Sequence, residues 1–440
     1  MDYADSASRN IQLFGRSARR HHKPLVKPTS KEFEFMNDLP YLVYLEGGPG
    51  VGNPEPQDSA LTAIFLNRGY QVLFLDYRGT GLSTPVNARW LAAQGEPKHQ
   101  ANYLKLFRAD NIVRDCEAVR KYLTADLPEE KKQWSLFGQS FGGFVSLTYL
   151  SKHPHYLREV FITGGLAPVL RTAEEVYRAT CQKTIERSGA YYRKFPEDIG
   201  KVGLIFNYLQ AAERDGKAIR LPDGGLLTAQ RFLTLGMSFG CHGGFDLVHS
   251  IVLKMNADLD QFGFLTRATL INLEKHNAFD ANPIYAILHE AIYCSREGMA
   301  SDWAAFRIAS EFKAFGWTHV KDIKMEAGVP IYFSGEMIFP FLFETYPELQ
   351  EMRDAADILA TFDGWDDLYD LDQLGRNDVP VYAASFIDDM YVDINFARET
   401  ANLIRGARTH ETNSMYHNAI RVRTGEALSH LFRLRDDTLD

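Results

Sequence analysis

The segment GQSFGG at residues 138–143 places Ser140 between glycines in the pattern G-x-S-x-G. An apolar run, WSLF, precedes it, and a longer stretch, FVSLTYL, follows it. A serine on a strained turn between a strand and a helix exposes its hydroxyl as a nucleophile, and small neighbours make that turn sterically feasible. The alternative is an ordinary glycine turn with an incidental serine. The choice depends on whether the sequence also supplies the partners of a nucleophile.

A serine hydroxyl needs a general base, usually a histidine that is oriented by a carboxylate. For a serine on a strand–turn–helix elbow, the acid comes next in the chain and the histidine last. The late histidines are His410, His417 and His430. His430 lies in an apolar-periodic helical segment, and His410 lies in what we expect to be the last strand. His417 lies in the loop between them, so we predict it as the base.

The acid is expected at the end of the strand that precedes this loop, where the segment IDDM supplies Asp388 and Asp389. One of the two would orient the histidine, while the other would cap the next helix or face solvent. Spacing alone leaves both residues open.

The tetrahedral intermediate of such a reaction needs backbone N–H donors. One would come from Phe141, directly after the serine. The other would come from LEGGPG at 45–50, because its glycines let the backbone approach an oxyanion closely. We therefore predict an oxyanion hole formed by Gly48 and Phe141. Nearby, Asp76 and Arg78 are expected to brace this loop through a charge-assisted pair rather than to take part in catalysis.

Short aliphatic and aromatic runs, typical of strands buried on both faces, alternate with helical segments in the first part of the chain. One of these helical segments, 110–123, carries apolar residues at steps of 4, 3 and 4, which give it one apolar face. This alternation predicts an α/β fold with a doubly wound, mostly parallel sheet. The strand-like runs cover 41–46, 71–77, 134–137, 159–165 and 379–386.

A long middle part of the chain has few strand-like runs. Its charged segments, such as 173–195 and 283–312, have a helical period. We predict that residues 168–375 form a large, mostly helical cap. It would be inserted into an α/β core formed by residues 1–167 and 376–440.

The composition of the 440 residues excludes several classes of function. The formal net charge of −9 argues against nucleic acid as the main partner, because phosphate binding needs a basic face. No apolar run approaches the roughly 20 residues of a membrane helix, and the polar N-terminus is unlike a signal peptide. The four cysteines are scattered without a CxxC pair, so no disulfide scaffold or zinc site is indicated. We expect a cytoplasmic protein with no metal or other cofactor and no membrane partner.

Four motifs together resemble the proline iminopeptidase (prolyl aminopeptidase) family of α/β hydrolases. That family is typified by an HGGPG loop, a D-x-R-G-x-G-x-S segment and a G-x-S-x-G-G elbow. The resemblance covers most of the chain, from about residue 41 to 434. The matching segments are EGGPG (46–50), DYRGTGLS (76–83), GQSFGG (138–143) and the late DDMY with its distant histidine.

The resemblance implies the α/β-hydrolase fold, with Ser140 as nucleophile and His417 as base. It also implies Asp389 as the acid, since the family's acid precedes a methionine-like position, as Asp389 precedes Met390. One position departs from the family pattern, because Glu46 stands where the usual histidine precedes GGPG. That histidine mainly shapes the oxyanion loop, so the departure concerns loop geometry rather than the triad.

Recognition of an N-terminal proline requires carboxylates for its protonated amine and aromatic side chains for its apolar ring. The segments LHEAIYC and SGEMIFPFLFE place acids among such residues. They resemble the cap segments from which the family's larger members draw amine-binding glutamates. Glu290 and Glu336 are therefore the predicted substrate-binding residues, with Glu344 in reserve. The alternative is that these glutamates are buried structural acids paired with arginine, because burying a carboxylate without a partner costs free energy.

These expectations favour a serine exopeptidase that releases N-terminal proline from short peptides through a prolyl-enzyme intermediate. An aminopeptidase of broader preference, or an esterase, would use the same triad without the cap glutamates. A catalytically silent binding protein of the same fold would lack a triad member, and the sequence lacks none. The oligomeric state stays open, with a homo-oligomer among the alternatives.

Overall fold

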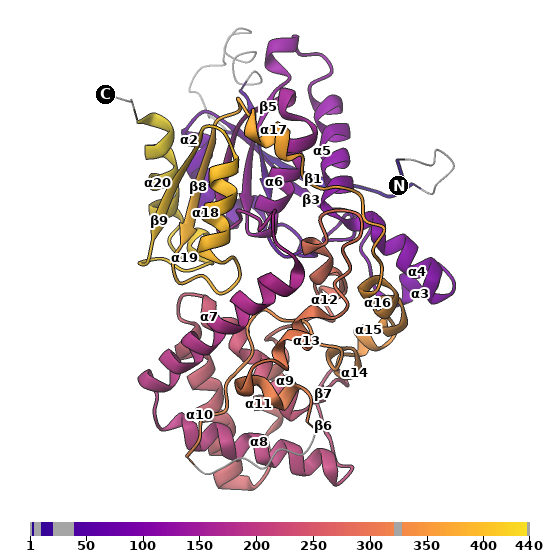
Figure 1. Cartoon of the computed structure of the whole chain (residues 1–440), viewed down its shortest axis with the longest axis vertical. Helices are drawn as coiled ribbons and strands as arrows, with labels where there is room; N and C mark the ends of the chain where they lie inside the picture. The colour runs from indigo at the N-terminus through magenta and orange to yellow at the C-terminus, as the bar shows by residue number, and fades with distance from the viewer. Residues whose placement is uncertain (1, 4–9, 21–38, 321–327, 438–440) are drawn as a thin grey trace, which may run out of the picture.

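The computed structural model describes residues 2–3, 10–20, 39–320 and 328–437, and its centre is a seven-stranded sheet (Figure 1). The strand order is β1-β3-β2-β4-β5-β8-β9, and every neighbouring pair is parallel except β1 and β3. This is the doubly wound, mostly parallel sheet that the strand–helix alternation predicts. The strands are β1 (Phe14–Ala18), β2 (Tyr41–Leu45), β3 (Gln71–Asp76), β4 (Trp134–Gln139), β5 (Leu157–Thr163), β8 (Val381–Phe386) and β9 (Ala407–Thr412).

The central strands have apolar sequences because both of their faces are covered. β2, β3, β4 and β8 are buried along their whole length, and β5 is buried except at one residue. β1 differs, because its five residues, FGRSA, alternate between half-buried and exposed, and it pairs antiparallel at the edge of the sheet. Such a short, mixed sequence carries no strong strand signal, so the sequence alone does not indicate β1.

Helices cover both faces of the sheet, as a doubly wound fold requires (Figure 1). On one face, α2 (Ala60–Asn67) packs against α20 (Thr424–Asp436), and the rings of Phe65 and Phe432 lie 5.4 Å apart. The helices of the other face are α5 (Ala109–Leu123), α6 (Phe141–Lys152) and α18 (Ile394–Leu403).

The chain between β5 and β8 is mostly helical and forms a second lobe beyond one end of the sheet (Figure 1). α7 (Ala173–Lys194) runs from the sheet into this lobe and begins with a capping box formed by Thr172 and Glu175. The cap boundaries drawn from the sequence, 168 and 375, remain a prediction.

The other helices of this lobe are α8 (Asp198–Arg214), α9 (Ala229–Leu233), α10 (Gly244–Phe262), α11 (Arg267–Glu274), α12 (Pro283–Leu288), α13 (Ala304–Ala309), α14 (Leu342–Thr345), α15 (Pro347–Gln350) and α16 (Arg353–Ala360). A two-stranded sheet lies among them, formed by β6 (Ile219–Arg220) and β7 (Leu226–Leu227). The last helix before β8, α17 (Leu371–Gly375), lies instead over the sheet beside α6 and α18 (Figure 1). Three short helices lie outside this segment, namely α3 (Ala88–Ala92), α4 (Pro97–Leu104) and α19 (Ala419–Val422).

The segment 283–312, whose period predicts helix throughout, is broken in the structure. It forms α12, a 3-10 turn over Glu290–Tyr293, an irregular connection and then α13. The connection contains Gly298, whose φ of 82° does not continue a right-handed helix. The sequence of this segment thus has a helical period, although its backbone is helical only in α12, the 3-10 turn and α13.

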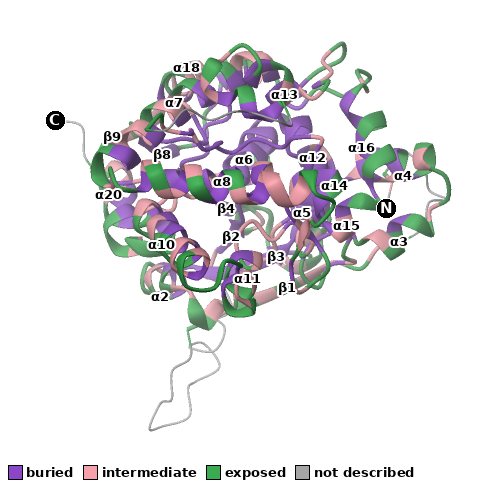
Figure 2. Ribbon diagram, turned by 90° about the horizontal axis from the view of Figure 1, so that it is seen from below, coloured by how far each residue is buried: buried purple, intermediate pink, exposed green. Residues whose placement is uncertain are grey.

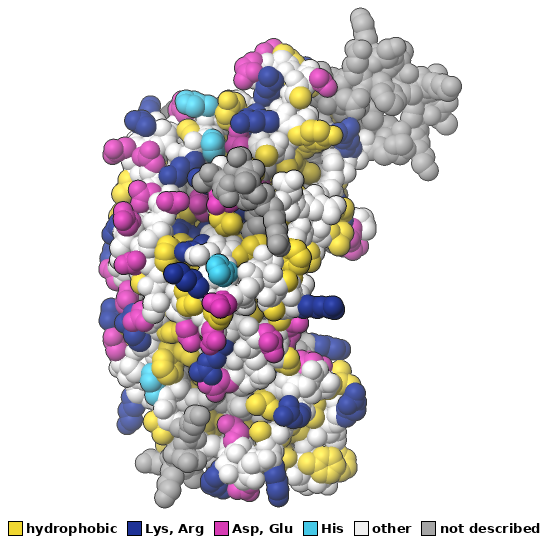
Figure 3. Space-filling model, turned by 90° about the vertical axis from the view of Figure 1, so that its right-hand side faces the viewer, with side chains coloured by type: hydrophobic (Ala, Val, Ile, Leu, Met, Phe, Trp, Pro, Cys, Tyr) yellow, Lys and Arg dark blue, Asp and Glu magenta, His cyan; other side chains and the backbone are white. Residues whose placement is uncertain are grey.

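Side chains of different kinds are distributed as in a globular protein. Buried residues gather in the middle of the molecule and exposed ones at its rim (Figure 2). On the face shown in Figure 3, acidic and basic side chains are interspersed rather than separated by sign. Among the described residues, no helix combines the length and the apolarity that crossing a membrane would take.

A close backbone contact fixes α6 against β2. Gly142 lies so near the end of β2 that a Cβ at this position would overlap the carbonyl oxygen of Leu45. A backbone carbonyl cannot rotate away as a flexible side chain can. The second glycine of the G-x-S-x-G motif is therefore required by packing between a helix and a strand.

We expect Gly142→Ala to lower the free energy of unfolding by about 2–3 kcal/mol, because the added methyl group forces α6 away from β2. Urea denaturation would measure the change. Gly203→Ala in α8 is the matched control, since its Cβ would meet no atom within 4 Å. That substitution should leave stability unchanged or raise it by about 0.5–1 kcal/mol. Equal midpoints for the two variants would contradict the prediction.

Candidate active site

Ser140 lies between the end of β4 and the start of α6, and its backbone is strained. Its φ of 53° and ψ of −122° lie in a region that residues other than glycine rarely adopt. Two hydrogen bonds hold this conformation. The Ser140 N–H donates to the carbonyl of Thr163 at 3.0 Å, and the Gly143 N–H donates to the carbonyl of Ser140 at 2.7 Å. The turn presents the serine hydroxyl at the carboxyl ends of the strands, as a nucleophile elbow does.

A chain of hydrogen bonds joins Ser140, His417 and Asp389. Ser140 Oγ lies 2.8 Å from His417 Nε2, and His417 Nδ1 lies 2.8 Å from Asp389 Oδ2. The other carboxylate oxygen, Oδ1, accepts backbone N–H groups from Tyr391 at 2.8 Å and Val392 at 3.2 Å. His417 and Asp389 are buried, so water competes little for these bonds. The arrangement is that of a nucleophile, its general base and an orienting acid.

The alternative acid and base residues do not take part in this chain. Asp388 is half-buried, and the carboxylate that reaches His417 is that of its neighbour, Asp389. The rings of His410 and His430 stack on each other with centroids 3.8 Å apart, between β9 and α20. Both of these histidines therefore pack against the outer edge of the sheet.

The pKa of His417 reflects two opposing effects. Burial disfavours the imidazolium, but the nearby carboxylates of Asp389 and Glu336 outweigh it, so the pKa is raised above the ordinary histidine value. The ring of Tyr391 lies against the imidazole, with centroids 4.4 Å apart. The backbone N–H of His417 donates to the carbonyl of Gly240 at 3.3 Å, so the middle segment of the chain helps to hold this histidine.

The predicted oxyanion donors lie on two segments beside the nucleophile. Phe141 is the first residue of α6, where backbone N–H groups have no partner within the helix. A Cβ on Gly47 would lie only 3.1 Å from the Cβ of Ser140, so the GGPG loop touches the elbow directly. Gly48 has a φ of 130°, which glycine alone adopts readily. The donor role of Gly48 and Phe141 remains a prediction that this arrangement supports.

Glu46, which stands in place of the family's histidine, is fully buried at the start of this loop. Its Oε1 accepts the Gly47 N–H at 2.7 Å and pairs with the Arg421 guanidinium at 2.7 Å. Burial raises the pKa of Glu46, and the charge of Arg421 opposes that rise. The pair therefore links the oxyanion loop to α19, one helical turn beyond His417.

Asp76 and Arg78 both stabilise this region, but through different partners. Asp76 Oδ1 accepts the Asn53 N–H at 2.8 Å, which braces the segment that follows GGPG. Arg78 makes a bidentate pair with Asp115 of α5, with N–O distances of 2.7 and 2.6 Å. The charge-assisted pair of Arg78 thus anchors the following turn to the helical layer, whereas the loop itself is braced by Asp76.

Glu336 lies on the connection before α14 and is held beside the catalytic residues. Its Oε1 accepts the hydroxyl of Tyr285 from α12. Two close contacts place these groups, because a Cβ on Gly50 of the oxyanion loop would lie 2.7 Å from Tyr285 N, and one on Gly335 would lie 3.4 Å from Met390 Cε. Burial raises the pKa of Glu336 to about 7, and the charge of His417 opposes the rise.

The other two predicted glutamates have different surroundings. Glu290 is buried, and its two oxygens accept the N–H groups of Ala304 at 3.1 Å and Ala305 at 2.9 Å, at the start of α13. Burial raises its pKa to about 7, and these backbone donors oppose the rise. Glu344 is exposed and pairs with Arg353 at 3.1 Å. Glu336 is thus the glutamate that directly contacts the surroundings of the triad.

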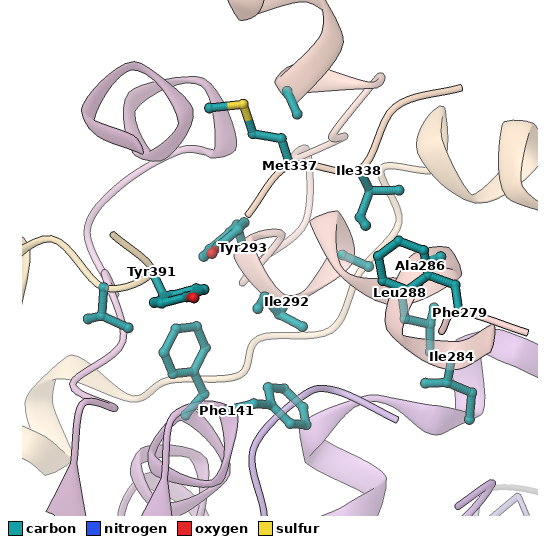
Figure 4. Close-up of a cluster of buried hydrophobic side chains, with 14 of the residues drawn as sticks. Phe141, Phe279, Ile284, Ala286, Leu288, Ile292, Tyr293, Met337, Ile338 and Tyr391 are labelled. Atoms are coloured by element: carbon teal, nitrogen blue, oxygen red, sulfur yellow. The ribbon is translucent and has the colours of Figure 1, made fainter. Parts of the chain in front are cut away.

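Buried apolar side chains form a cluster that reaches from α6, next to the elbow, to the helical segment above it (Figure 4). Phe141 of α6 and Tyr391 after the acid lie on one side, and Ile292, Tyr293 and Met337 lie on the other. All five are buried. An apolar wall of this kind suits a compact apolar group placed beside the nucleophile.

One group of described residues could offer ligands to a metal, namely Glu197, Asp198 and His249 in the middle segment. Asp198 already accepts the hydroxyl of Tyr191, lies 2.8 Å from the ring of His249 and pairs with Lys201 at 3.4 Å. These partners account for its burial as part of a polar network. The group lies on α8 and α10, apart from the residues around Ser140.

Sequence reasoning missed Arg421 and Tyr285, although both hold groups of the site in place. The sequence signal for Arg421 is only its spacing of one helical turn from His417. Tyr285 reads as an ordinary aromatic residue of an apolar helical segment. Only the fold brings each of them to its carboxylate partner.

Comparisons with known proteins agree with this architecture. A model of the α/β hydrolase fold family matches residues 40–188. The proline iminopeptidase aneH of Aspergillus aculeatus is 41% identical over 403 residues, which cover 92% of this chain and 86% of that protein. The proline iminopeptidase of Aeromonas sobria is 41% identical over 427 residues, which cover 97% of this chain and 92% of that protein.

Similarity to solved structures is more distant. The crystal structure of the proline iminopeptidase of Mycobacterium smegmatis is matched with a TM-score of 0.43 and 12% sequence identity. The match covers 97% of this chain and 95% of that one.

The geometry predicts different consequences for the two neighbouring aspartates. Asp389→Asn should lower kcat by about 10³–10⁴-fold, because an amide no longer holds the base in its tautomer or stabilises the imidazolium. Asp388→Asn should stay within a few-fold of the parent protein. Steady-state kinetics, with thermal unfolding to check the fold, would test this. A large loss in the Asp388 variant alone would refute the assignment.

Proposed function

The chain belongs to the proline iminopeptidase family of α/β hydrolases, and from this premise we propose how its own residues carry out the reaction. It is a prolyl aminopeptidase, a serine hydrolase that acts on peptides. The proposal assigns the nucleophile, base, acid, oxyanion donors and amine-binding carboxylates. The observation that carries it is the hydrogen-bond chain from Ser140 through His417 to Asp389.

In the acylation step, Ser140 Oγ attacks the carbonyl carbon of the N-terminal proline. His417 Nε2 takes the hydroxyl proton as the new bond forms, and Asp389 stabilises the resulting imidazolium. The N–H groups of Gly48 and Phe141 stabilise the negative charge on the former carbonyl oxygen. When the intermediate collapses, the peptide C–N bond breaks and His417 gives its proton to the departing amine.

Deacylation repeats these roles with water in place of the serine. His417 removes a proton from a water molecule, whose oxygen attacks the ester carbonyl of the prolyl-enzyme. The same two N–H groups stabilise the second oxyanion. Collapse releases free proline and returns the proton to Ser140 Oγ, so the enzyme is regenerated without a cofactor.

Glu336 is the carboxylate that we assign to the substrate amine. It is buried beside the triad, and its ordinary partner in the structure is the neutral hydroxyl of Tyr285 rather than a cation. A buried carboxyl with a pKa of about 7 is easily ionised when a positive charge is placed next to it. Glu290 is proposed as a second acid, because its oxygens each accept one backbone N–H and keep acceptor capacity.

The helical segment over the elbow explains why the natural substrates should be short peptides with N-terminal proline. The nucleophile lies between the sheet and this segment, so a chain end reaches it more easily than the middle of a folded protein. A cytoplasmic location is part of the proposal, and the four cysteines, which are free thiols in the structure, fit a reducing compartment.

A panel of anilides would test the proposed substrate class. Prolyl-anilide should be cleaved best, and alanyl-, leucyl- and phenylalanyl-anilides less well. N-acetyl-prolyl-anilide should be refused, because it lacks the cation that Glu336 is proposed to bind. Ser140→Ala should lose nearly all activity while it keeps its thermal stability. Cleavage of simple esters with every anilide left intact would preserve the triad but refute the aminopeptidase assignment.

The pH dependence of kcat/KM should report both Glu336 and His417. Glu336 must be ionised to pair with the ammonium, so activity should fall as pH drops through about 7. His417 must be neutral to accept the serine proton, so activity should also fall below its pKa, which lies above the ordinary value. In Glu336→Gln the loss of activity caused by protonation of residue 336 disappears. The pKa of His417 also drops, because an anionic neighbour is removed.

In the Glu336→Gln variant, the fall of kcat/KM at acid pH should therefore occur at lower pH than in the parent protein. The overall rate should also be lower. Rates for prolyl-anilide between about pH 5 and 8 would show the shift. Glu344→Gln is the control, since this exposed acid pairs with Arg353, and its profile should match that of the parent protein. An unmoved midpoint in Glu336→Gln would contradict the proposed coupling.

A further inference from the structure

His289 is a buried histidine whose ring nitrogens have no hydrogen-bond partner in the structure. It follows the last residue of α12, and 1% of its surface is exposed. Its ring stacks on Tyr285 with centroids 5.2 Å apart and packs edge-on against Tyr293 at 6.1 Å. Neither Nδ1 nor Nε2 is hydrogen-bonded. A buried imidazole without partners is costly, so its position calls for a ligand.

The polar atom that faces His289 belongs to Glu336. His289 Nε2 lies 3.8 Å from Glu336 Oε2, which is too far for a hydrogen bond between them. The other oxygen of the same carboxylate, Oε1, is held by the Tyr285 hydroxyl. Nε2 and Oε2 therefore form a pair of neighbouring acceptors that are close together but not bonded to each other.

This pair matches the geometry of a secondary ammonium. A nitrogen atom about 2.8–2.9 Å from both acceptors would have them roughly 85° apart. Two N–H bonds about 109° apart would then each lie about 12° off the line to their acceptor, a bend that hydrogen bonds tolerate. An N-terminal proline carries two such N–H donors. A primary ammonium carries three, and the third would be left without an acceptor in a dry site.

The pair also adjoins the region where the substrate amine is expected. The amine is one carbon removed from the carbonyl that Ser140 attacks, so its site must adjoin the oxyanion loop. His289 stacks on the ring of Tyr285, and the backbone nitrogen of Tyr285 packs closely against Gly50 of that loop. Glu336 is close enough to His417 for their charges to interact.

We propose that His289 is a substrate-binding residue whose neutral Nε2 accepts one N–H of the prolinium while Glu336 Oε2 accepts the other. This inference rests on the proposed aminopeptidase function and adds a reason for the preference for a secondary amine. Burial lowers the pKa of His289 to about 3, which keeps the ring neutral and leaves one nitrogen as an acceptor. In this tautomer Nδ1 carries the proton.

The test compares prolyl-anilide with N-methyl-prolyl-anilide, whose tertiary ammonium has a single N–H. The ratio of kcat/KM for the two substrates should be high in the parent protein, since only prolyl-anilide uses both acceptors. In His289→Phe, which keeps an aromatic ring against Tyr285 but lacks an acceptor, the ratio should fall about tenfold or more. His289→Gln offers an amide oxygen instead and should recover part of the ratio.

His276→Phe is the matched control, because this half-buried histidine lies after α11, away from the triad, and its ratio should equal that of the parent protein. If His289→Phe is unstable in thermal unfolding, His289→Leu gives the same comparison. An unchanged ratio, with both substrates slowed equally, would show a packing role alone and overturn the proposal.

The same panel separates this proposal from the function on which it rests. If the parent protein cleaves cyclopentanecarboxylic anilide, which has no amine, as fast as prolyl-anilide, amine recognition itself fails. If prolyl-anilide is preferred but the His289 variants keep the parent ratio, only the role of His289 fails.

Discussion

The strained backbone of Ser140 is the constraint on which the rest of the site depends. Its conformation is tolerable only because neighbouring backbone segments come within hydrogen-bonding distance and because glycines leave room for them. The carbonyl of Thr163 in β5 accepts the backbone N–H of Ser140, and β2 lies so close that position 142 has no room for a side chain. The order of the strands in the sheet therefore fixes the direction of the hydroxyl. The segments that follow β8 and β9 then bring Asp389 and His417 to it at the carboxyl end of the sheet.

The site is assembled from two parts of the chain that meet over this elbow. The α/β core supplies Ser140, Asp389, His417 and the GGPG loop, whereas the helical segment supplies Glu336, Tyr285 and several of the buried apolar side chains beside them. Backbone contacts join the two parts, including the bond from His417 to Gly240 and the contact of Gly50 with α12. Because these contacts reach His417 and the GGPG loop directly, the segment proposed to select the substrate also positions the proposed base.

The sequence predicts the features whose signals are local. Strong apolar runs mark the buried strands, and the elbow with the late histidine and aspartate marks the residues around Ser140. Spacing could not choose between Asp388 and Asp389, since the direction of each carboxylate depends on the turn after β8, and only the family resemblance pointed to Asp389. Arg421 and the break before α13 were equally hidden, because partners distant in sequence determine them. Edge strand β1 escaped for a different reason, namely its short half-exposed sequence.

The pairing of β5 with β8 has a consequence for how the protein is made. Val160 and Val381 are partners in adjacent central strands, although roughly 220 residues separate them. Loop closure over such a length adds little to the entropic cost of folding, but it delays the contact until the intervening chain exists. During synthesis the half of the sheet that carries Ser140 emerges long before β8 and β9, which precede Asp389 and His417. A nascent chain can thus form the elbow of Ser140 well before Asp389 and His417 have been synthesised.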